Sequence, residues 1–269
     1  MGELEGRAAL ITGGSTGLGL ATARAYLREG ARVVFTGRNE EIGRAAEADL
    51  RAEGDATFIR ADAARVDEID ASVHEATTRL GGLDILVNNA GIGVVARPLD
   101  TTIAEFDTVM AVNVRGYFRY GQACFAALEE RRGCMIHVGS DAGILGEVEI
   151  GVYSVSKAAV HMLSNMFAIE GGRRGVRSNV IAPGDTEPGM RHMTLPGQPE
   201  RADDPSTWPV PPIGRLGRAT DVADAAVYLA SDRASFANGI VLTLDGGMRA
   251  GYNTGTFRPK DTGKGRAAQ

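Results

Sequence analysis

The feature that most constrains this chain is a regular alternation between short apolar runs and longer amphipathic stretches. Apolar runs rich in branched residues predict strands, and apolar residues repeated every three or four positions predict helices. Strands without a polar face are typical of a sheet that is covered by helices on both sides. The predicted strands are residues 8–12, 32–36, 57–60, 85–88, 135–139, 178–181 and 241–244, and the predicted helices are residues 18–28, 40–52, 66–80, 103–130, 152–170 and 220–230.

This order of elements favours right-handed crossovers between parallel strands. We therefore expect an α/β fold with a doubly wound, Rossmann-like sheet of seven parallel strands. A length of 269 residues and a hydrophobic content of 43% suit one domain with a large core, which we place at residues 1–250. The predicted helix at residues 103–130 is expected to break near Asn113.

Two segments interrupt the alternation. Residues 184–218 hold most of the prolines and show no clear periodicity. A long irregular insertion in a compact domain is usually functional or disordered, and its place after a predicted strand favours a substrate-binding lid. Residues 251–269 are polar and too poor in apolar side chains to fold alone, so we expect this tail to be mobile or to lie on a neighbouring subunit.

Charge and composition exclude several classes of protein. A formal net charge of -5 argues against nucleic-acid or anionic-membrane partners. No apolar run approaches the roughly 20 residues that span a bilayer, and the N-terminus lacks the pattern of a secretory signal. Cys124 and Cys134 are expected to be buried, reduced thiols, and the four histidines show no metal-ligand spacing. We expect a cytoplasmic protein without a metal.

A glycine-rich turn follows the first predicted strand and leads directly into the first predicted helix. Glycines let the backbone turn tightly and let a pyrophosphate approach main-chain N–H groups, while the helix N-terminus supplies partial positive charge. The spacing differs from the common dinucleotide fingerprint, and a tight turn that binds nothing is the alternative. The expected contacts to a dinucleotide are Gly13, Ser15, Thr16, Gly17, Leu18 and Gly19.

The end of the second predicted strand bears on the choice between the two nicotinamide cofactors. An acidic residue at this place binds the ribose 2′-hydroxyl of NAD, whereas an arginine accommodates the 2′-phosphate of NADP. Here Gly37 is followed by Arg38, and no carboxylate stands at the strand end. We therefore expect NADP(H) to be favoured, with NAD(H) possible if Arg38 is only a solvated surface charge.

Tyr153 and Lys157 stand four residues apart at the start of a predicted helix, so their side chains share one face. A phenol has an ordinary pKa of about 10, and a nearby ammonium is expected to lower it into the range of an acid–base catalyst. Ser140, at the end of the preceding predicted strand, is placed to steady the substrate oxygen. Because a tyrosine and a lysine at this spacing are usually structural, the interpretation also depends on Ser140 and the glycine turn.

Together these motifs resemble the short-chain dehydrogenase/reductase family, in its compact single-domain branch. The resemblance covers residues 4–247, and the motifs are highly specific in this order. They are the glycine turn at Gly13, Gly17 and Gly19, the run Asn88-Asn89-Ala90-Gly91, Asn113, Ser140, Tyr153 with Lys157, Pro183-Gly184, and Asp245-Gly246-Gly247.

The resemblance implies a catalytic role for four residues. Tyr153 would be the general acid in reduction and the base in oxidation. Lys157 would bind the nicotinamide ribose and lower the pKa of the tyrosine. Ser140 would orient the substrate carbonyl, and Asn113 would hold a water in a proton relay behind Lys157.

The resemblance also implies further contacts to the cofactor. Asp62, followed by Ala63, would contact the adenine, and the run Asn89, Ala90 and Gly91 would line the ribose side. Pro183 and Gly184 would lie against the nicotinamide. After this pair the chain departs from the family pattern, because Thr186 takes the usual apolar place and Pro188 replaces the usual threonine. Thr186 is still placed to reach the carboxamide, whereas Asp141, which follows Ser140, caps a turn or faces the substrate.

The expected function is hydride transfer between NADP(H) or NAD(H) and a ketone or secondary alcohol. A 3-oxoacyl thioester or a general ketone is the leading substrate, and a sugar, polyol or steroid is nearly as plausible. A nucleotide-sugar epimerase is disfavoured because those proteins usually carry a separate substrate domain. A catalytically silent nucleotide sensor is the alternative from another class. The family resemblance implies a homotetramer or homodimer, formed through the helices around residues 117–128 and 152–170.

Overall fold

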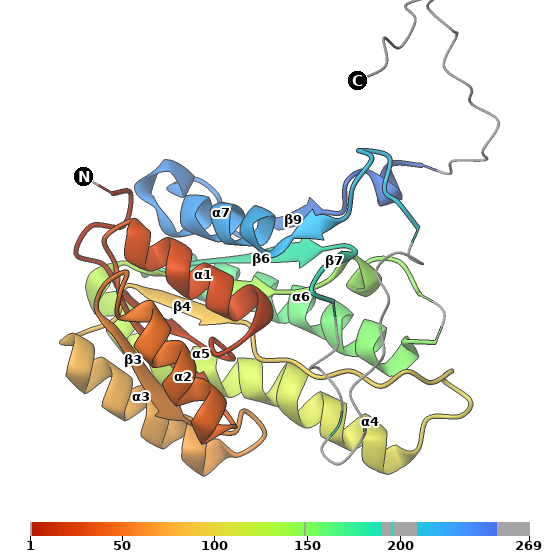
Figure 1. Ribbon diagram of the computed structural model, residues 1–269, viewed down its shortest axis with the longest axis horizontal. Helices are drawn as coiled ribbons and strands as arrows, with labels where there is room; N and C mark the ends of the chain where they lie inside the picture. The colour runs from red at the N-terminus through yellow and green to blue at the C-terminus, as the bar shows by residue number, and fades with distance from the viewer. Residues whose placement is uncertain (1, 148, 190–194, 196–208, 252–269) are drawn as a thin grey trace, which may run out of the picture.

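The computed structural model describes residues 2–147, 149–189, 195 and 209–251. Their centre is a seven-stranded parallel sheet with the order β3-β2-β1-β4-β5-β6-β9 (Figure 1). The strands are β1 (Ala8–Ile11), β2 (Arg32–Gly37), β3 (Ala56–Arg60), β4 (Ile85–Asn88), β5 (Cys134–Val138), β6 (Arg177–Pro183) and β9 (Val241–Leu244). The predicted doubly wound sheet is confirmed, and the order reverses between β1 and β4, where such sheets form a ligand crevice.

Helices cover both faces of the sheet, as the apolar strands require. One face packs against α1, α2 and α7, and the other packs against α3, α4, α5 and α6 (Figure 1). The strands β1, β4 and β5 are buried at every position, which explains why they lack a polar face. The helices are α1 (Gly17–Arg28), α2 (Glu40–Leu50), α3 (Val66–Leu80), α4 (Ile103–Met110), α5 (Tyr117–Arg131), α6 (Gly151–Gly172) and α7 (Ala219–Ala230).

The predicted break in the helix at residues 103–130 is confirmed as a π-helical segment, Ala111–Gly116, between α4 and α5. The hydroxyl of Thr102 accepts the Glu105 N–H, and the Glu105 carboxylate accepts the Thr102 N–H, so α4 begins with a capping box. The wider turn that follows is the kind of segment that often marks a functional site. It places Asn113 in the interior, with no exposed surface.

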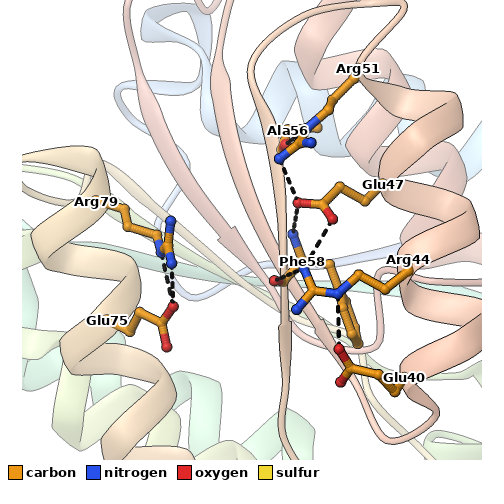
Figure 2. Close-up of polar contacts among 8 residues, drawn as sticks. All are labelled: Glu40, Arg44, Glu47, Arg51, Ala56, Phe58, Glu75 and Arg79. Carbon is orange, nitrogen blue, oxygen red and sulfur yellow. Dashed lines mark hydrogen bonds and ion pairs between the residues drawn. The ribbon is translucent and has the colours of Figure 1, made fainter.

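The outer edge of the sheet is held to α2 by one buried carboxylate. Glu47 accepts hydrogen bonds from the Phe58 backbone N–H (3.1 Å), from Arg44 (3.0 Å) and from Arg51 (2.9 Å), as Figure 2 shows. Gly43 permits the close approach, because a Cβ there would lie 2.1 Å from the Phe58 ring. This contact fixes the edge of the fold beside the end of β2.

A pair of two-residue strands, β7 (Thr186–Glu187) and β8 (Gly217–Arg218), was not predicted. The two strands pair in parallel, and the Gly217 N–H donates to the Asp185 carbonyl at 2.9 Å. They fix both ends of the predicted insertion. Most of that insertion (residues 190–194 and 196–208) and the tail at residues 252–269 lie outside the described residues, so the lid and tail interpretations stay predictions.

Candidate active site

A cavity of about 770 Å³ runs along the carboxyl ends of the strands, from the end of β2 to the end of β6. Ligands of doubly wound sheets bind at this edge. Of the predicted cofactor contacts, all but Gly19 line the cavity: Gly13, Ser15, Thr16, Gly17, Leu18, Arg38, Asp62, Ala63, Asn89, Ala90, Gly91, Tyr153, Lys157, Pro183, Gly184 and Thr186. Ser140 also lines it, whereas Asn113 does not.

The glycine turn has the form that a dinucleotide requires. Gly13 and Gly17 take φ values of +64° and +53°, which side chains rarely adopt. A Cβ at Gly13 would lie 2.8 Å from the Ala90 Cα, so the turn passes directly beside the end of β4. Thr16 makes no side-chain capping bond to α1, and the first turn of α1 holds no acidic residue. Backbone N–H groups of this turn can therefore bind a pyrophosphate.

Gly19 serves the turn in a different way from the one predicted. A Cβ there would lie 2.2 Å from the Gly13 carbonyl oxygen and 2.5 Å from Asn89 Nδ2. Its lack of a side chain thus lets α1 pack against the turn. Asn89 braces the same turn from β4, because its side-chain amide donates to the carbonyls of Thr12 (3.0 Å) and Gly13 (2.9 Å).

The end of the cavity beside β2 and β3 holds one arginine, Arg38. Arg38 follows β2, is exposed, and forms no ion pair within the described part of the chain. A Cβ at Gly37 would lie 2.7 Å from Ser15 Oγ, so the Ser15 hydroxyl lies against the strand end next to Arg38. Asp62, after β3, accepts the Ala64 N–H at 2.9 Å, which fixes its carboxylate at the cavity wall.

Ser140 and Tyr153 meet at the inner wall. Ser140 follows β5, and Tyr153 lies in the first turn of α6, where only 6% of its surface is exposed. The Ser140 hydroxyl lies close enough to lower the pKa of Tyr153. It donates to Asp141 Oδ1 and accepts the Ala142 N–H, both at 3.2 Å. The short turn after β5 therefore fixes the position of this hydroxyl beside Tyr153.

Lys157 lies one turn further along α6 and is 1% exposed. Its Nζ lies 5.6 Å from the centre of the Tyr153 ring. It donates hydrogen bonds to the Val138 carbonyl at 2.7 Å and to the Tyr117 hydroxyl at 3.3 Å. Burial lowers the pKa of Lys157 from its ordinary 10.5 to about 7, because a charged amine loses its water here.

The expected lowering of the Tyr153 pKa is wrong for the polypeptide by itself. Burial raises this pKa well above its ordinary value, the nearby Ser140 hydroxyl lowers it, and the carboxylates of Asp141 and Glu147 raise it further. Lys157 does not reverse the shift, because its own charge is weakened by burial and its bonds run to Val138 and Tyr117. Tyr153 is thus held as a protonated phenol.

The side chain of Asn113 is fully used by the protein. Its Oδ1 accepts the Ile92 N–H at 2.9 Å, and its Nδ2 donates to the Ile92 carbonyl at 2.8 Å and to Ser156 Oγ at 3.0 Å. These bonds tie the π-helical segment to α6 and to the loop after β4.

Carboxylates gather at the substrate end of the cavity. Asp141 Oδ1 accepts the Ala142 N–H at 2.8 Å, so Asp141 caps the turn, which is one of its two expected roles, and it also lines the cavity. Burial raises the pKa of Asp141 and of Asp185, which lines the same wall. Thr186 donates its hydroxyl to the Gly184 carbonyl at 2.8 Å, which leaves its oxygen lone pairs for another donor.

In the described part of the chain, no group of three or more His, Cys, Asp or Glu side chains is arranged to hold a metal ion. No helix in the same residues is long and apolar enough to cross a bilayer.

Known proteins resemble this chain along almost its whole length. The family model described as Enoyl-(Acyl carrier protein) reductase matches residues 13–249. A 2-(S)-hydroxypropyl-CoM dehydrogenase of Xanthobacter autotrophicus is 36% identical over 92% of this chain and 98% of its own length. An L-fucose dehydrogenase of Oryctolagus cuniculus is 34% identical over 94% of this chain and 88% of its own length. The crystal structure of a short-chain dehydrogenase from Burkholderia cenocepacia in complex with NADP has a TM-score of 0.82 at 32% identity, over 91% and 98%.

The chain belongs to the short-chain dehydrogenase/reductase family. It is therefore an oxidoreductase that acts on CH–OH groups or ketones with a nicotinamide cofactor. The cavity fits such a cofactor, because the glycine turn that lines it leads into the N-terminus of α1, whose first turn holds no acidic residue to repel a pyrophosphate.

Sequence reasoning missed two residues of this short-chain dehydrogenase/reductase site. Thr12 Oγ1 accepts the backbone N–H groups of Asn89 (2.9 Å) and Ala90 (3.0 Å), which joins the ends of β1 and β4. Tyr117 bonds Lys157 from another helix. Thr12 could have been found from the sequence, because its hydroxyl stands at the end of a predicted strand. Tyr117 could not, because nothing in the sequence distinguishes it from an ordinary aromatic core residue.

Proposed function

We propose that Tyr153 is the proton donor and acceptor of the reaction, with Ser140 and Lys157 as its partners. The observation that carries the proposal is that Ser140, Tyr153 and Lys157 lie together on the wall of the cavity, with Lys157 Nζ 5.6 Å from the centre of the Tyr153 ring. Ser140 orients the substrate oxygen, and the Tyr153 hydroxyl gives its proton to that oxygen or takes one from it. Because burial raises the pKa of Tyr153, its hydroxyl is already protonated for carbonyl reduction, whereas alcohol oxidation requires it to lose that proton.

The cofactor residues divide into three groups along the cavity. The turn from Gly13 to Leu18 would hold the pyrophosphate, and Asp62, Ala63 and the run from Asn89 to Gly91 would line the adenosine side. The nicotinamide would lie between Lys157 and the Pro183–Thr186 segment. When bound, it supplies or accepts the hydride. Lys157 would bind its ribose, and Asn113 would hold a water in a proton relay behind Lys157.

We propose NADP(H) as the preferred cofactor. Arg38 has no carboxylate partner within the described residues, and the Ser15 hydroxyl lies beside it at the end of β2. A free guanidinium and a hydroxyl favour a 2′-phosphate over a 2′-hydroxyl. A related structure holds NADP.

Replacing Arg38 by glutamine tests this preference. A charge-assisted hydrogen bond contributes about 1.5–3 kcal/mol, so kcat/KM for NADPH should fall by at least about 10-fold while that for NADH stays within about 3-fold. Arg79→Gln is the matched control, because Arg79 is an exposed arginine that pairs only with Glu75. A better kcat/KM for NADH than for NADPH in the unaltered protein would contradict the proposal.

The substrate that we propose is a ketone or secondary alcohol. Among the classes that the sequence leaves open, hydroxylated ones are favoured by Asp141 and Asp185 at the substrate end. Carboxyl groups accept hydrogen bonds from hydroxyl groups and repel the phosphates of carrier-bound thioesters. Relatives are named for L-fucose, a steroid and a hydroxypropyl thioether.

A substrate panel read at the nicotinamide absorbance band separates these choices. It should contain a 3-oxoacyl thioester, a cyclic ketone, a sugar or polyol and a hydroxysteroid, each with NADP(H) and NAD(H). Turnover of a hydroxylated substrate is the expected result, and turnover of the thioester alone would overturn the preference. Binding of NADPH without turnover of any alcohol or ketone would instead favour the silent sensor.

We also propose a homo-oligomer in the cytoplasm. Five large apolar side chains on α5 and α6 are 43–72% exposed, an unusual share for helices near a core. They are Phe118, Val155, Met162, Met166 and Ile169. Cys124 and Cys134 are free, buried thiols, which suits a reducing compartment. A sedimentation experiment that finds only monomer would exclude the oligomer.

A further inference from the structure

A second tyrosine hydroxyl lies next to Lys157. Tyr117 is the first residue of α5, directly after the π-helical segment, and is 1% exposed. Its hydroxyl donates to the Val138 carbonyl at 3.2 Å and accepts the Lys157 ammonium at 3.3 Å. The face of its ring lies 5.2 Å from Lys157 Nζ. Tyr117 does not line the cavity, so it meets Lys157 from behind.

The bonds to Lys157 leave it one free donor. An ammonium has three N–H groups, and the Val138 carbonyl and the Tyr117 hydroxyl accept two of them. The third is left for the cavity, which Lys157 lines. Both acceptors are buried and fixed to regular elements, β5 and α5, so they determine where the amine points.

No other group that faces Lys157 can balance its charge. On α6 it is flanked by Tyr153 and His161, on β5 by His137, and on the turn after β5 by Asp141, which faces Tyr153. Burial lowers the pKa of His137 to about 3 and that of His161 to about 4, so both are neutral. None of the carboxylates in the described residues forms an ion pair with Lys157. Charge stabilisation thus falls to the two oxygen acceptors and to the rings of Tyr117 and Tyr153.

We propose that Tyr117 is a positioning residue for Lys157, whose hydroxyl accepts one ammonium N–H, keeps the amine charged and directs its free N–H toward the cavity. The inference adds a residue to the proposed site and rests on the assigned role of Lys157 only for its catalytic consequence. Burial raises the pKa of Tyr117, so it remains a neutral phenol and does not itself donate a proton to substrate.

The composition of the chain makes a direct test available. Its only lysines are Lys157, Lys260 and Lys264, so selective lysine labelling gives three side-chain signals. The signal that disappears in Lys157→Met belongs to Lys157. Its titration by NMR in the full chain without cofactor reports the pKa of the amine independently of any activity.

Tyr117→Phe removes the hydroxyl and keeps the ring. The pKa of Lys157 should then fall by at least about half a unit, because a hydrogen bond to the charged form is lost. Tyr120→Phe is the matched control, since Tyr120 lies on the same helix, is equally buried, and bonds Ser72 instead. There the pKa of Lys157 should stay within about 0.2 units.

The outcomes separate the two proposals. An unchanged or raised Lys157 pKa in folded Tyr117→Phe overturns the positioning role, and so does an equal fall in Tyr120→Phe. If the pKa falls, the alkaline limit of kcat/KM for ketone reduction should move to lower pH by the same amount. A lowered pKa with an unmoved pH profile keeps the positioning role and removes Lys157 from the proposed mechanism.

Discussion

Two regions of this protein hold basic side chains in opposite ways. On α2, Arg44 and Arg51 are largely exposed and share the carboxylate of Glu47, while Arg44 also pairs with Glu40 (Figure 2). On α6, Lys157 is almost completely buried and has two uncharged oxygens as partners. The arginines beside Glu47 are exposed to solvent and paired with carboxylates. Lys157 is buried and paired with none in the described part of the chain.

The pKa values follow this difference. The hydrogen bonds that Arg44 donates to Glu47 and Glu40 raise the pKa of Arg44, which fixes its charge. Burial lowers the pKa of Lys157 to about 7, which places its charge at the point where it can change. A charge with a partner stabilises a fold at every working pH, whereas an isolated buried charge costs stability and serves chemistry.

Lys157→Met gives the largest expected effect on this contrast. The unfolded chain keeps the lysine proton up to about pH 10.5, but the folded chain keeps it only up to about pH 7, so wild-type stability rises with pH between these values. Methionine removes this dependence. The variant should therefore be more stable than the wild type near pH 6.5, by an amount on the order of several kcal/mol, and the gap should shrink toward pH 10.

Chemical denaturation at pH 6.5 and pH 9.5 measures the difference in the free energy of unfolding between Lys157→Met and the wild type. Other titrating groups are shared by both proteins and cancel in the difference. A gap that stays constant, or that widens as the pH rises, would show that Lys157 is not buried as a strained cation.

Tyr153→Phe tests the same region through chemistry. Loss of the phenol oxygen should lower turnover by at least about 100-fold, the range of general acid–base catalysis. Tyr26→Phe is a suitable control, because it removes an equally buried hydroxyl that bonds the Ala226 carbonyl between α1 and α7. Its turnover should stay near that of the wild type. Near-normal turnover in a folded Tyr153→Phe variant would refute the role of Tyr153.

The carboxylate region should respond more weakly and only in stability. Glu47→Ala leaves the buried Phe58 N–H and two guanidinium groups without their acceptor, so it should cost about 1–3 kcal/mol in the free energy of unfolding. Glu75→Ala removes an exposed pair with Arg79 and should cost less than about 0.5 kcal/mol (Figure 2). Equal losses in the two variants, measured by urea denaturation, would remove the distinction between them.

Much of the fold could be predicted from the sequence because its signals are local. The seven apolar runs became the seven strands of the main sheet, and the break near Asn113 became a π-helical segment. The two-residue strands β7 and β8 were missed because two residues are too few to show a periodicity. The spatial order of the strands depends on long-range pairing, which a single sequence does not contain.

The sequence indicated which residues lie together at the cavity, but it did not predict their pKa values. The spacing of Tyr153 and Lys157 correctly placed both on one wall of the cavity. Their pKa values could not be predicted, because burial depends on every element that packs around them. Tyr117 lies 40 positions before Lys157, and only folding brings its hydroxyl to the amine.

The small pair β7–β8 bears on how this enzyme could be altered. Because Thr186 pairs with Gly217 and Glu187 with Arg218, the stretch between them departs from and rejoins the same patch of the scaffold. Replacing the sequence between these two strands would therefore leave the glycine turn and the tyrosine–lysine pair unchanged, because they lie on other parts of the chain. A library of such replacements would test whether this stretch selects the substrate.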